Sequence, residues 1–122
     1  MKILGIGVDL IKNKRINLLI KNHNFIKRTF SKKEIDHFKK YRNNDNYYSK
    51  RFAAKESFSK AFGTGIRNDL NFKDIEILNN RLGKPYFLKN KKIDKLIDKK
   101  FKTKKYNLFL SISDEKDYSI AF

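Results

Sequence analysis

A segment from about Tyr47 to Phe62, with the spacing of one long helix, constrains the fold of this chain more than any other feature. Its apolar residues recur at i, i+4, i+7 and i+8, the stripe that a helix buries: Ala54, Phe58, Ala61 and Phe62. Gly63-Thr64-Gly65 follows at once, and glycine commonly ends a helix. The sequence therefore predicts a helix over 47–62 that packs by this stripe against the rest of the core.

The remaining sequence mixes strand and helix patterns, which predicts an α+β fold of helices packed on antiparallel strands. Because the chain has 122 residues and shows no repeat or linker, we expect a single domain over residues 1–122. In chain order the patterns predict a strand over 2–8, a short helix near 16–20, helices over 31–42 and 47–62, a hairpin over 75–88 with a turn at 83–85, a short helix near 93–97, and a second hairpin with strands over 106–112 and 118–122.

Local signals refine three of these elements. Gly5 and Gly7 lie between the apolar residues of the first strand, which indicates that its backbone approaches a neighbour closely. Asp9 is expected at the end of that strand, just before a helix. Ser31-Lys32-Lys33-Glu34 matches a capping box, and Asn43–Asn46 is expected to form a polar loop.

Charge and the lack of cysteine limit the classes of protein that fit. There is no cysteine, which excludes disulfide scaffolds and thiolate metal sites. The apolar run 3–11 contains Asp9 and is followed by Lys12, so it is neither a signal peptide nor a membrane span, and we expect a cytoplasmic protein. Thirty Lys and Arg against thirteen Asp and Glu give a net charge of +17, which favours nucleic acid, an anionic membrane surface or an acidic protein as partner. A bias toward A/T-rich codons is the alternative explanation of the many lysines.

Several common catalytic and nucleotide-binding patterns are missing. His23 and His37 lie in basic stretches and are expected on the surface, which argues against histidine metal sites and Ser/His/Asp triads. Gly5-Ile6-Gly7 opens like a dinucleotide fingerprint, but Leu10 stands where the third glycine is needed, and no P-loop is present. Zinc-finger DNA readers are excluded by the lack of cysteine.

A candidate metal and phosphate site remains on the helix over 47–62. Glu56 and Lys60 are four residues apart and share one helix face, directly before the glycine loop Gly63-Thr64-Gly65. Mg²⁺ is usually held by one or two carboxylates with waters and phosphate oxygens, and Asp9 is the obvious second carboxylate. The alternatives are an exposed Glu56–Lys60 ion pair and a helix N-cap role for Asp9.

Five segments in a fixed order carry a family resemblance that covers the whole chain. They are GIGVD at Gly5–Asp9, RFAAKESFSKAFGTGI at Arg51–Ile66, DIEI at Asp74–Ile77, GKPY at Gly83–Tyr86 and LSIS at Leu110–Ser113. Together they closely resemble the holo-[acyl-carrier-protein] synthases, the small bacterial 4′-phosphopantetheinyl transferases.

The resemblance implies the reaction and a role for each matching residue. Such enzymes move 4′-phosphopantetheine from coenzyme A to a serine of apo acyl carrier protein, a step on which fatty-acid synthesis depends, and leave adenosine 3′,5′-bisphosphate. By resemblance, Asp9 and Glu56 are the magnesium ligands and Lys60 contacts the coenzyme A phosphates; the proton acceptor is Glu56 or a magnesium-bound water. The implied coenzyme A contacts also include Arg51, Gly63, Thr64, Gly65, Lys84, Pro85 and Ser111.

The resemblance also implies how the protein meets its partners. Arg15 and Arg28 match basic positions of the surface that docks the acidic carrier protein. The family is usually a homotrimer with active sites shared between subunits, and neither a membrane nor a specific nucleic acid is expected as partner.

Two departures from the family pattern affect these expectations. Relatives often carry histidines where this chain has Phe109 and Asp114, so the nucleotide contacts of this region differ, and Asp114 is interpreted as a turn residue that faces solvent. The chain also stops at Phe122, some residues before relatives end the last strand, so edge pairing or trimer contacts are expected to be weaker. A basic nucleic-acid-binding module and a catalytically silent carrier-protein binder are the alternative hypotheses.

Overall fold

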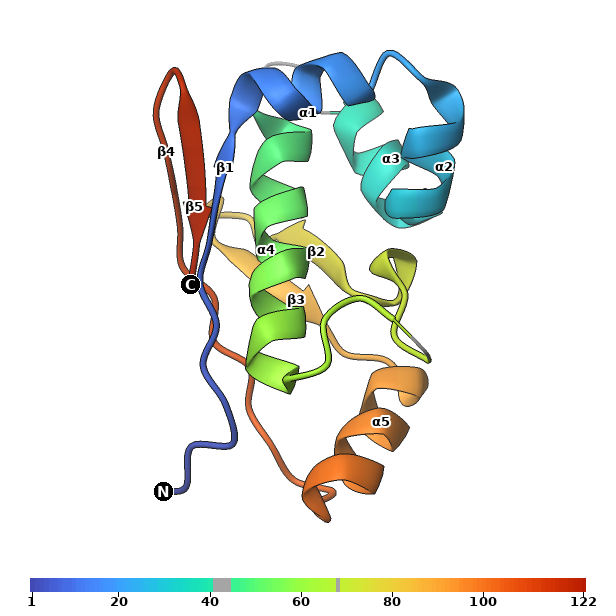
Figure 1. Cartoon of the computed structure of the whole chain (residues 1–122), viewed down its shortest axis with the longest axis vertical. Coiled ribbons are helices and arrows are strands. Elements are labelled where there is room, and N and C mark those ends of the chain that lie inside the picture. The colour runs from blue at the N-terminus through green and yellow to red at the C-terminus, as the bar shows by residue number, and fades with distance from the viewer. Residues whose placement is uncertain (41–44, 68) are drawn as a thin grey trace.

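The computed structural model describes residues 1–40, 45–67 and 69–122 (Figure 1). The helices are α1 (Asn13–Leu19), α2 (His23–Thr29), α3 (Lys32–Lys40), α4 (Tyr47–Phe62) and α5 (Lys91–Phe101), with a 3₁₀ turn η1 (Phe72–Asp74). The strands are β1 (Asp9–Lys12), β2 (Glu76–Asn79), β3 (Pro85–Leu88), β4 (Ile112–Asp114) and β5 (Tyr118–Ala121). The α+β class and both hairpins are as the sequence predicts.

Helix α4 is the centre of the molecule. In Figure 1 the sheet β1-β5-β4 lies on one side of α4, helices α1, α2 and α3 lie around its upper half, and the β2–β3 hairpin passes behind it. Twelve of the sixteen residues of α4 are buried, so the helix is covered on nearly all sides rather than along one stripe. Gly63 ends α4 in the left-handed conformation, at φ 98°, as the sequence indicated.

The sheet beside α4 is antiparallel, with the last strand, β5, at its centre. Asp9 of β1 pairs with Ala121, and Ile112 of β4 pairs with the other side of the same residue. Ser119 and Ala121 point inward and are buried against α4. The alternating residues Tyr118, Ile120 and Phe122 do share a face, but it is the exposed face, which turns away from α4.

The prediction of a strand over 2–8 is wrong, whereas the close approach inferred from its glycines is confirmed. The first strand begins at Asp9, and residues 2–8 run beside α4 without strand pairing in the described structure. A Cβ atom on Gly5 would lie 2.0 Å from the carbonyl oxygen of Ala61, and one on Gly7 would lie 2.0 Å from that of Ser57. Both positions therefore exclude any side chain while the segment keeps this path.

Other element boundaries also differ from the sequence prediction. The capping box is confirmed: the amide of Glu34 donates to Ser31 Oγ (3.3 Å), and that of Ser31 donates to Glu34 Oε1 (3.0 Å). Helix α3 is described to Lys40, and residues 41–44, which hold the expected helix end and the first half of the polar loop, lie outside the described residues. Helix α2 was not predicted. Residues 106–111, expected as strand, contribute no described strand, although Tyr106, Leu108 and Leu110 pack on the core.

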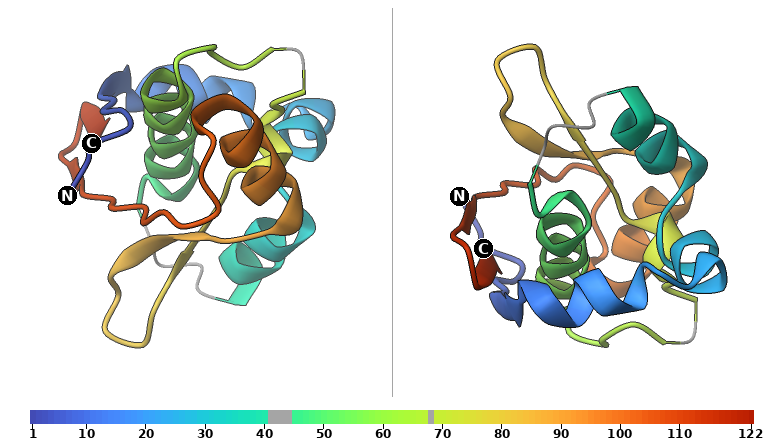
Figure 2. Two further views of the ribbon diagram at one scale, coloured as in Figure 1. Left: turned by 90° about the horizontal axis from the view of Figure 1, so that it is seen from below. Right: turned by 90° about the horizontal axis from the view of Figure 1, so that it is seen from above.

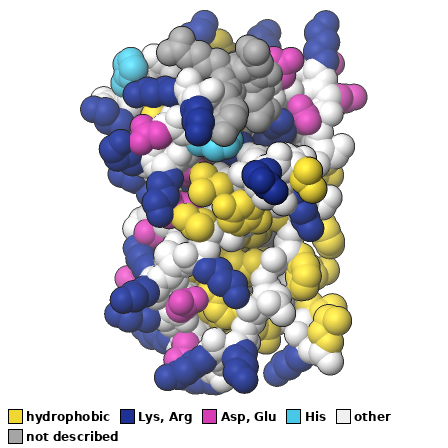
Figure 3. Space-filling model, turned by 180° about the vertical axis from the view of Figure 1, so that it is seen from behind, with side chains coloured by type: hydrophobic (Ala, Val, Ile, Leu, Met, Phe, Trp, Pro, Cys, Tyr) yellow, Lys and Arg dark blue, Asp and Glu magenta, His cyan; other side chains and the backbone are white. Residues whose placement is uncertain are grey.

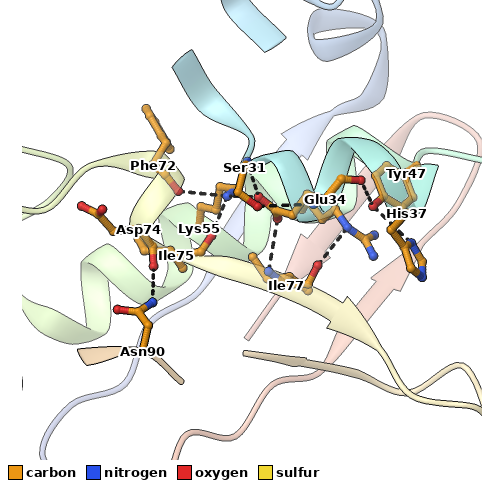
Figure 4. A network of polar contacts seen from close by, with 11 residues as sticks. Ser31, Glu34, His37, Tyr47, Lys55, Phe72, Asp74, Ile75, Ile77 and Asn90 are labelled. Carbon is orange, nitrogen blue, oxygen red and sulfur yellow. Dashed lines mark hydrogen bonds and ion pairs between the residues drawn. The ribbon is translucent and has the colours of Figure 1, made fainter. Parts of the chain in front are cut away.

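A buried ion pair joins α4 to α3 and β2 (Figure 4). Lys55 Nζ lies 2.6 Å from Glu34 Oε1, and both side chains have no solvent exposure. The ammonium also donates to the carbonyl oxygens of Phe72 (2.9 Å) and Ile75 (2.5 Å), while Glu34 Oε2 accepts from the amide of Ile77 (3.1 Å). Every donor of the lysine has an acceptor, which is the condition under which a buried charge is tolerated.

Candidate active site

Asp9 and Lys60 meet where β1 passes the C-terminal half of α4. Lys60 Nζ lies 3.1 Å from Asp9 Oδ1 and donates to the carbonyl oxygen of Val8 at 2.9 Å. The Asp9 side chain is 16% exposed and that of Lys60 is 54% exposed, so the pair lies at the surface with its carboxylate the more enclosed partner. The structure thus brings together two residues that are far apart in the sequence.

Glu56 lies one helical turn before Lys60 and completes this group. Burial raises the pKa of Glu56, and the negative charge of Asp9 raises it further. The cations of Lys60 and Arg15 act in the opposite direction on the same pKa. All three residues predicted to be catalytic therefore share one electrostatic environment, which also includes Arg15.

The structure decides against both alternative roles for these residues. Lys12, not Asp9, is the N-cap of α1, and no side chain caps that helix. Asp9 is the first residue of β1, which corrects the expectation that it ends a strand. Among the described residues, the ion-pair partner of Lys60 is Asp9 rather than Glu56. Asp9 and Glu56 are therefore available as carboxylate ligands beside one cationic side chain.

The donor set of Asp9 and Glu56 fits Mg²⁺. The described residues contain no group of three or more His, Cys, Asp or Glu placed to hold a metal ion, so the protein itself offers two carboxylates. Mg²⁺ often takes one or two carboxylates and fills its remaining positions with water and phosphate oxygens. The charge of Asp9 raises the pKa of Glu56, and a divalent cation bound between the two carboxylates would offset this repulsion.

The predicted glycine loop follows Lys60 at the C-terminal end of α4. Gly63 and Gly65 have φ values of 98° and 71°, in the region that favours glycine. Their amides both donate to the carbonyl oxygen of Ser59, at 2.9 and 3.3 Å, and the hydroxyl of Thr64 donates to the carbonyl oxygen of Gly65 at 2.9 Å. These bonds give the loop a defined shape next to Lys60.

The other predicted coenzyme A contacts lie elsewhere in the chain. Arg51 is buried, and its guanidinium carbon lies 3.6 Å from the centre of the Tyr47 ring. The guanidinium donates a hydrogen bond of 2.5 Å to Asn79 Oδ1. Asn79 in turn donates to the carbonyl oxygen of Gly83, so Arg51 supports the hairpin turn that carries Lys84 and Pro85.

This hairpin turn projects from the body of the molecule (Figure 2). Ser111 is exposed and pairs through its backbone with Phe122. No described hydrogen bond or ion pair connects Arg51, Lys84 or Ser111 with Asp9 or Glu56. Arg51 is thus connected through Asn79 to the hairpin turn, whereas Ser111 lies beside the end of β5.

The two arginines of the predicted docking surface lie on the first two helices. Arg15 of α1 lies over the ring of Phe52 (5.9 Å), and Arg28 of α2 lies over that of Phe25 (5.7 Å). Both side chains belong to exposed residues. Because Arg15 also acts on the pKa of Glu56, this basic surface adjoins the carboxylates of the candidate site.

Comparison with known proteins decides the family. A sequence model of the 4′-phosphopantetheinyl transferase superfamily matches residues 5–122. The chain belongs to this superfamily. It is 60% identical over 122 residues to a holo-[acyl-carrier-protein] synthase of Pelagibacter ubique, an alignment that covers 100% of this chain and 95% of the relative.

Solved structures of the superfamily share the fold. The crystal structure of the Neisseria meningitidis holo-[acyl-carrier-protein] synthase matches with a TM-score of 0.86 and 38% identity, over 98% of this chain and 95% of that one. The Helicobacter pylori holo-[acyl-carrier-protein] synthase, solved in complex with coenzyme A, matches with a TM-score of 0.78 and 29% identity, over 95% of each chain.

The two residues that stand where relatives often carry histidines are both exposed. Phe109 is 82% exposed. Asp114 is exposed at the end of β4, where its Oδ2 accepts a hydrogen bond of 3.0 Å from Asn46 at the start of α4. Asp114 is thus a strand-end residue rather than a turn residue, and its carboxylate faces the opposite end of α4 from the glycine loop.

Sequence reasoning missed two basic contributions to the site. Arg15 was assigned only to partner docking, although its charge reaches Glu56. Lys100 was not assigned at all, yet its ammonium contacts the end of α4. Neither could be selected from sequence alone, because thirty Lys and Arg offer no pattern that distinguishes them.

Proposed function

We propose that this chain transfers 4′-phosphopantetheine from coenzyme A to a serine of apo acyl carrier protein and releases adenosine 3′,5′-bisphosphate. The observation that carries the proposal is the meeting of Asp9, Glu56 and Lys60 beside the glycine loop. Family membership, the 60% identical holo-[acyl-carrier-protein] synthase and a structural relative with bound coenzyme A support it.

The arrangement suits an attack by the serine hydroxyl on the β-phosphorus of coenzyme A. The serine oxygen forms a bond to this phosphorus, and the bond from the phosphorus to the oxygen of the adenosine-bearing phosphate breaks. Mg²⁺, held by Asp9 and Glu56, would supply positive charge to the pyrophosphate. Lys60 neutralises the charge that gathers on the phosphate oxygens. Among the chain's own groups, Glu56 is the candidate acceptor of the serine proton, since its raised pKa strengthens it as a base.

Mass spectrometry of an apo carrier protein incubated with coenzyme A and Mg²⁺ tests this function. We expect the carrier protein to gain the mass of one phosphopantetheine group at one serine. A stable carrier complex without a mass change would favour the silent binder instead. Binding to any polyanion, with affinity that falls steeply as salt is raised and with no mass change, would favour the nucleic-acid module.

We further propose that the carrier protein docks on the surface around Arg15 and Arg28. The net charge of +17 attracts an acidic partner over a distance, and these two arginines lie next to the candidate active site. The resemblance to the family supports a role of this reaction in cytoplasmic fatty-acid biosynthesis. No helix of the described residues is long and apolar enough to cross a membrane.

A homotrimer is the assembly that we propose. The outer face of the sheet and the adjoining N-terminal segment expose six apolar residues: Ile6, Val8, Leu10, Tyr118, Ile120 and Phe122. Figure 3 shows exposed hydrophobic side chains along its right edge, with other groups between them. Exposed apolar patches of this kind usually mark an interface. Association would also let the projecting hairpin turn of one subunit approach the carboxylates of another.

Replacing Ile120 with Lys is expected to prevent this association. Ile120 lies opposite Leu10 on the exposed face, so a charge there would have to be buried in the interface. Light scattering should give three times 14.6 kDa for the unchanged protein and a lower mass for the variant, with a large loss of transfer activity. Leu18→Lys, at a position that is 56% exposed on α1, is the control and should keep the trimer mass. An active unchanged protein with monomer mass would overturn the proposal.

A further inference from the structure

Lys100 of α5 reaches across to the end of α4, where the glycine loop begins. Its ammonium donates a hydrogen bond to the backbone carbonyl of Phe62, the last residue of α4. It lies 4.7 Å from the ring centre of Phe62 and 5.4 Å from that of Phe101. One contact is electrostatic and two are cation–π, so the side chain is anchored although the residue is exposed.

Lys100 contacts the C-terminal end of α4, a position that favours a cation. The last carbonyl groups of a helix lack partners within the helix, and they form the negative end of its dipole. A lysine that comes from another helix satisfies one of these carbonyls and opposes that charge. Its contact therefore stabilises the geometry at the point where α4 turns into the loop.

Gly63 shows how tightly the ammonium packs on the loop. A Cβ atom at Gly63 would lie 2.7 Å from Lys100 Nζ, and the residue has a φ of 98°. Position 63 is thus restricted by its backbone conformation, and a side chain there would also displace the Lys100 ammonium. Lys100 fixes the first residue of the segment proposed to border coenzyme A.

The other end of the loop is held in a similar way. Arg67 donates from Nε to the carbonyl oxygen of Thr64 at 2.5 Å. The salt bridges among the described residues include neither Arg67 nor Lys100, so both positive charges are balanced by carbonyl dipoles rather than by a carboxylate. Lys100 and Arg67 thus place two positive charges at the two ends of the loop that no described carboxylate balances, which favours an anion there.

We propose that Lys100 is a positioning residue for coenzyme A binding, acting through the loop Gly63–Gly65. It holds the carbonyl of Phe62 and the backbone of Gly63 so that the loop is preformed when the phosphates arrive. The inference deepens the proposed function and rests on it. Lys100 does not act on the carboxylates, so it affects the capture of coenzyme A and leaves the chemical step unchanged.

Lys100→Met tests the inference because methionine keeps an apolar stem for the two rings and removes the ammonium. We expect the KM for coenzyme A to rise about tenfold, equivalent to about 1.4 kcal/mol, with kcat within about twofold and the KM for carrier protein unchanged. Lys100→Arg should restore most of the affinity, since it keeps a charged donor. Titration with adenosine 3′,5′-bisphosphate should show the same loss in Lys100→Met without any reaction.

Lys99→Met is the matched control. Lys99 is the neighbouring exposed lysine of the same helix turn, carries the same charge, and has no described hydrogen bond or ion pair. An equal effect of Lys99→Met and Lys100→Met on the KM would show that only net charge matters and would overturn the inference, as would a fall in kcat at constant KM. If Lys100→Met does not fold, Lys100→Gln decides by the same measurements. Should the unchanged protein fail to modify a carrier protein, the proposed function itself fails, which is a separate result.

Discussion

Replacement of Asp9 by Asn, or of Glu56 by Gln, is expected to lower the rate of phosphopantetheine transfer by about 10²–10⁴-fold at saturating Mg²⁺. Both changes keep the size of the side chain and remove one of two carboxylates that lie together beside Lys60. Loss of one carboxylate weakens the proposed magnesium site and leaves Lys60 with a smaller counter-charge. Chelation of Mg²⁺ from the unchanged protein should abolish transfer, and added Mg²⁺ should restore it.

Asp36→Asn is the control for the loss of one negative charge. Asp36 is an exposed residue of α3 that pairs with Lys32, away from the candidate site. Its replacement should leave the transfer rate unchanged, while circular dichroism should show that all three variants are folded. Transfer near the normal rate in both Asp9→Asn and Glu56→Gln would exclude the proposed metal site.

Lys55→Met is expected to reduce the free energy of unfolding by about 3–5 kcal/mol, the usual result of removing one partner from a buried ion pair. The variant leaves Glu34 as an unpaired carboxylate with no solvent exposure. It also leaves the carbonyl oxygens of Phe72 and Ile75 without their donor. Urea denaturation followed by circular dichroism measures this loss of unfolding free energy. The position of the Glu56 side chain is also expected to change, because Glu56 follows Lys55 on the same helix.

Two comparisons separate the buried pair from a general effect of charge. Lys32→Met removes a lysine from an ion pair whose lysine side chain is 87% exposed, and it should change stability little. The double variant Glu34→Gln with Lys55→Met should recover part of the loss, because it no longer buries a single charge. If Lys55→Met were as stable as the unchanged protein, the buried pair would contribute nothing to the fold.

Local patterns were sufficient to predict α4 and to select the residues that the structure brings together at the candidate site. The i, i+4 spacing places Glu56 and Lys60 on one face without any knowledge of the fold, and glycine marks the end of the helix. Asp9 was found from the need for a second carboxylate, yet its position at the start of β1 could not be derived. Strand pairing depends on a partner, and the partner of β1 is at the other end of the chain.

Tertiary context decided what the sequence patterns left open. Alternation shows that Tyr118, Ile120 and Phe122 share a face of β5, but it does not show whether that face packs on the core. In the structure α4 packs against the opposite face, where the residues Ser119 and Ala121 are small. The family resemblance implies that Arg51 contacts coenzyme A, and the structure adds that it is buried over Tyr47. No local property of an arginine distinguishes these two places.

The pairing of β1 with β5 also sets the order in which the candidate site can form during synthesis. Asp9 leaves the ribosome well before its strand partner Ala121, which lies much later in the sequence. Helix α4, with Glu56 and Lys60, can form early because its contacts within the helix are local. Asp9 therefore cannot take up its paired position until β5 has been made, and a ribosome-bound chain that lacks β5 would carry Glu56 and Lys60 without Asp9 in place. Truncation of the chain before β5, by premature termination or proteolysis, would have the same effect.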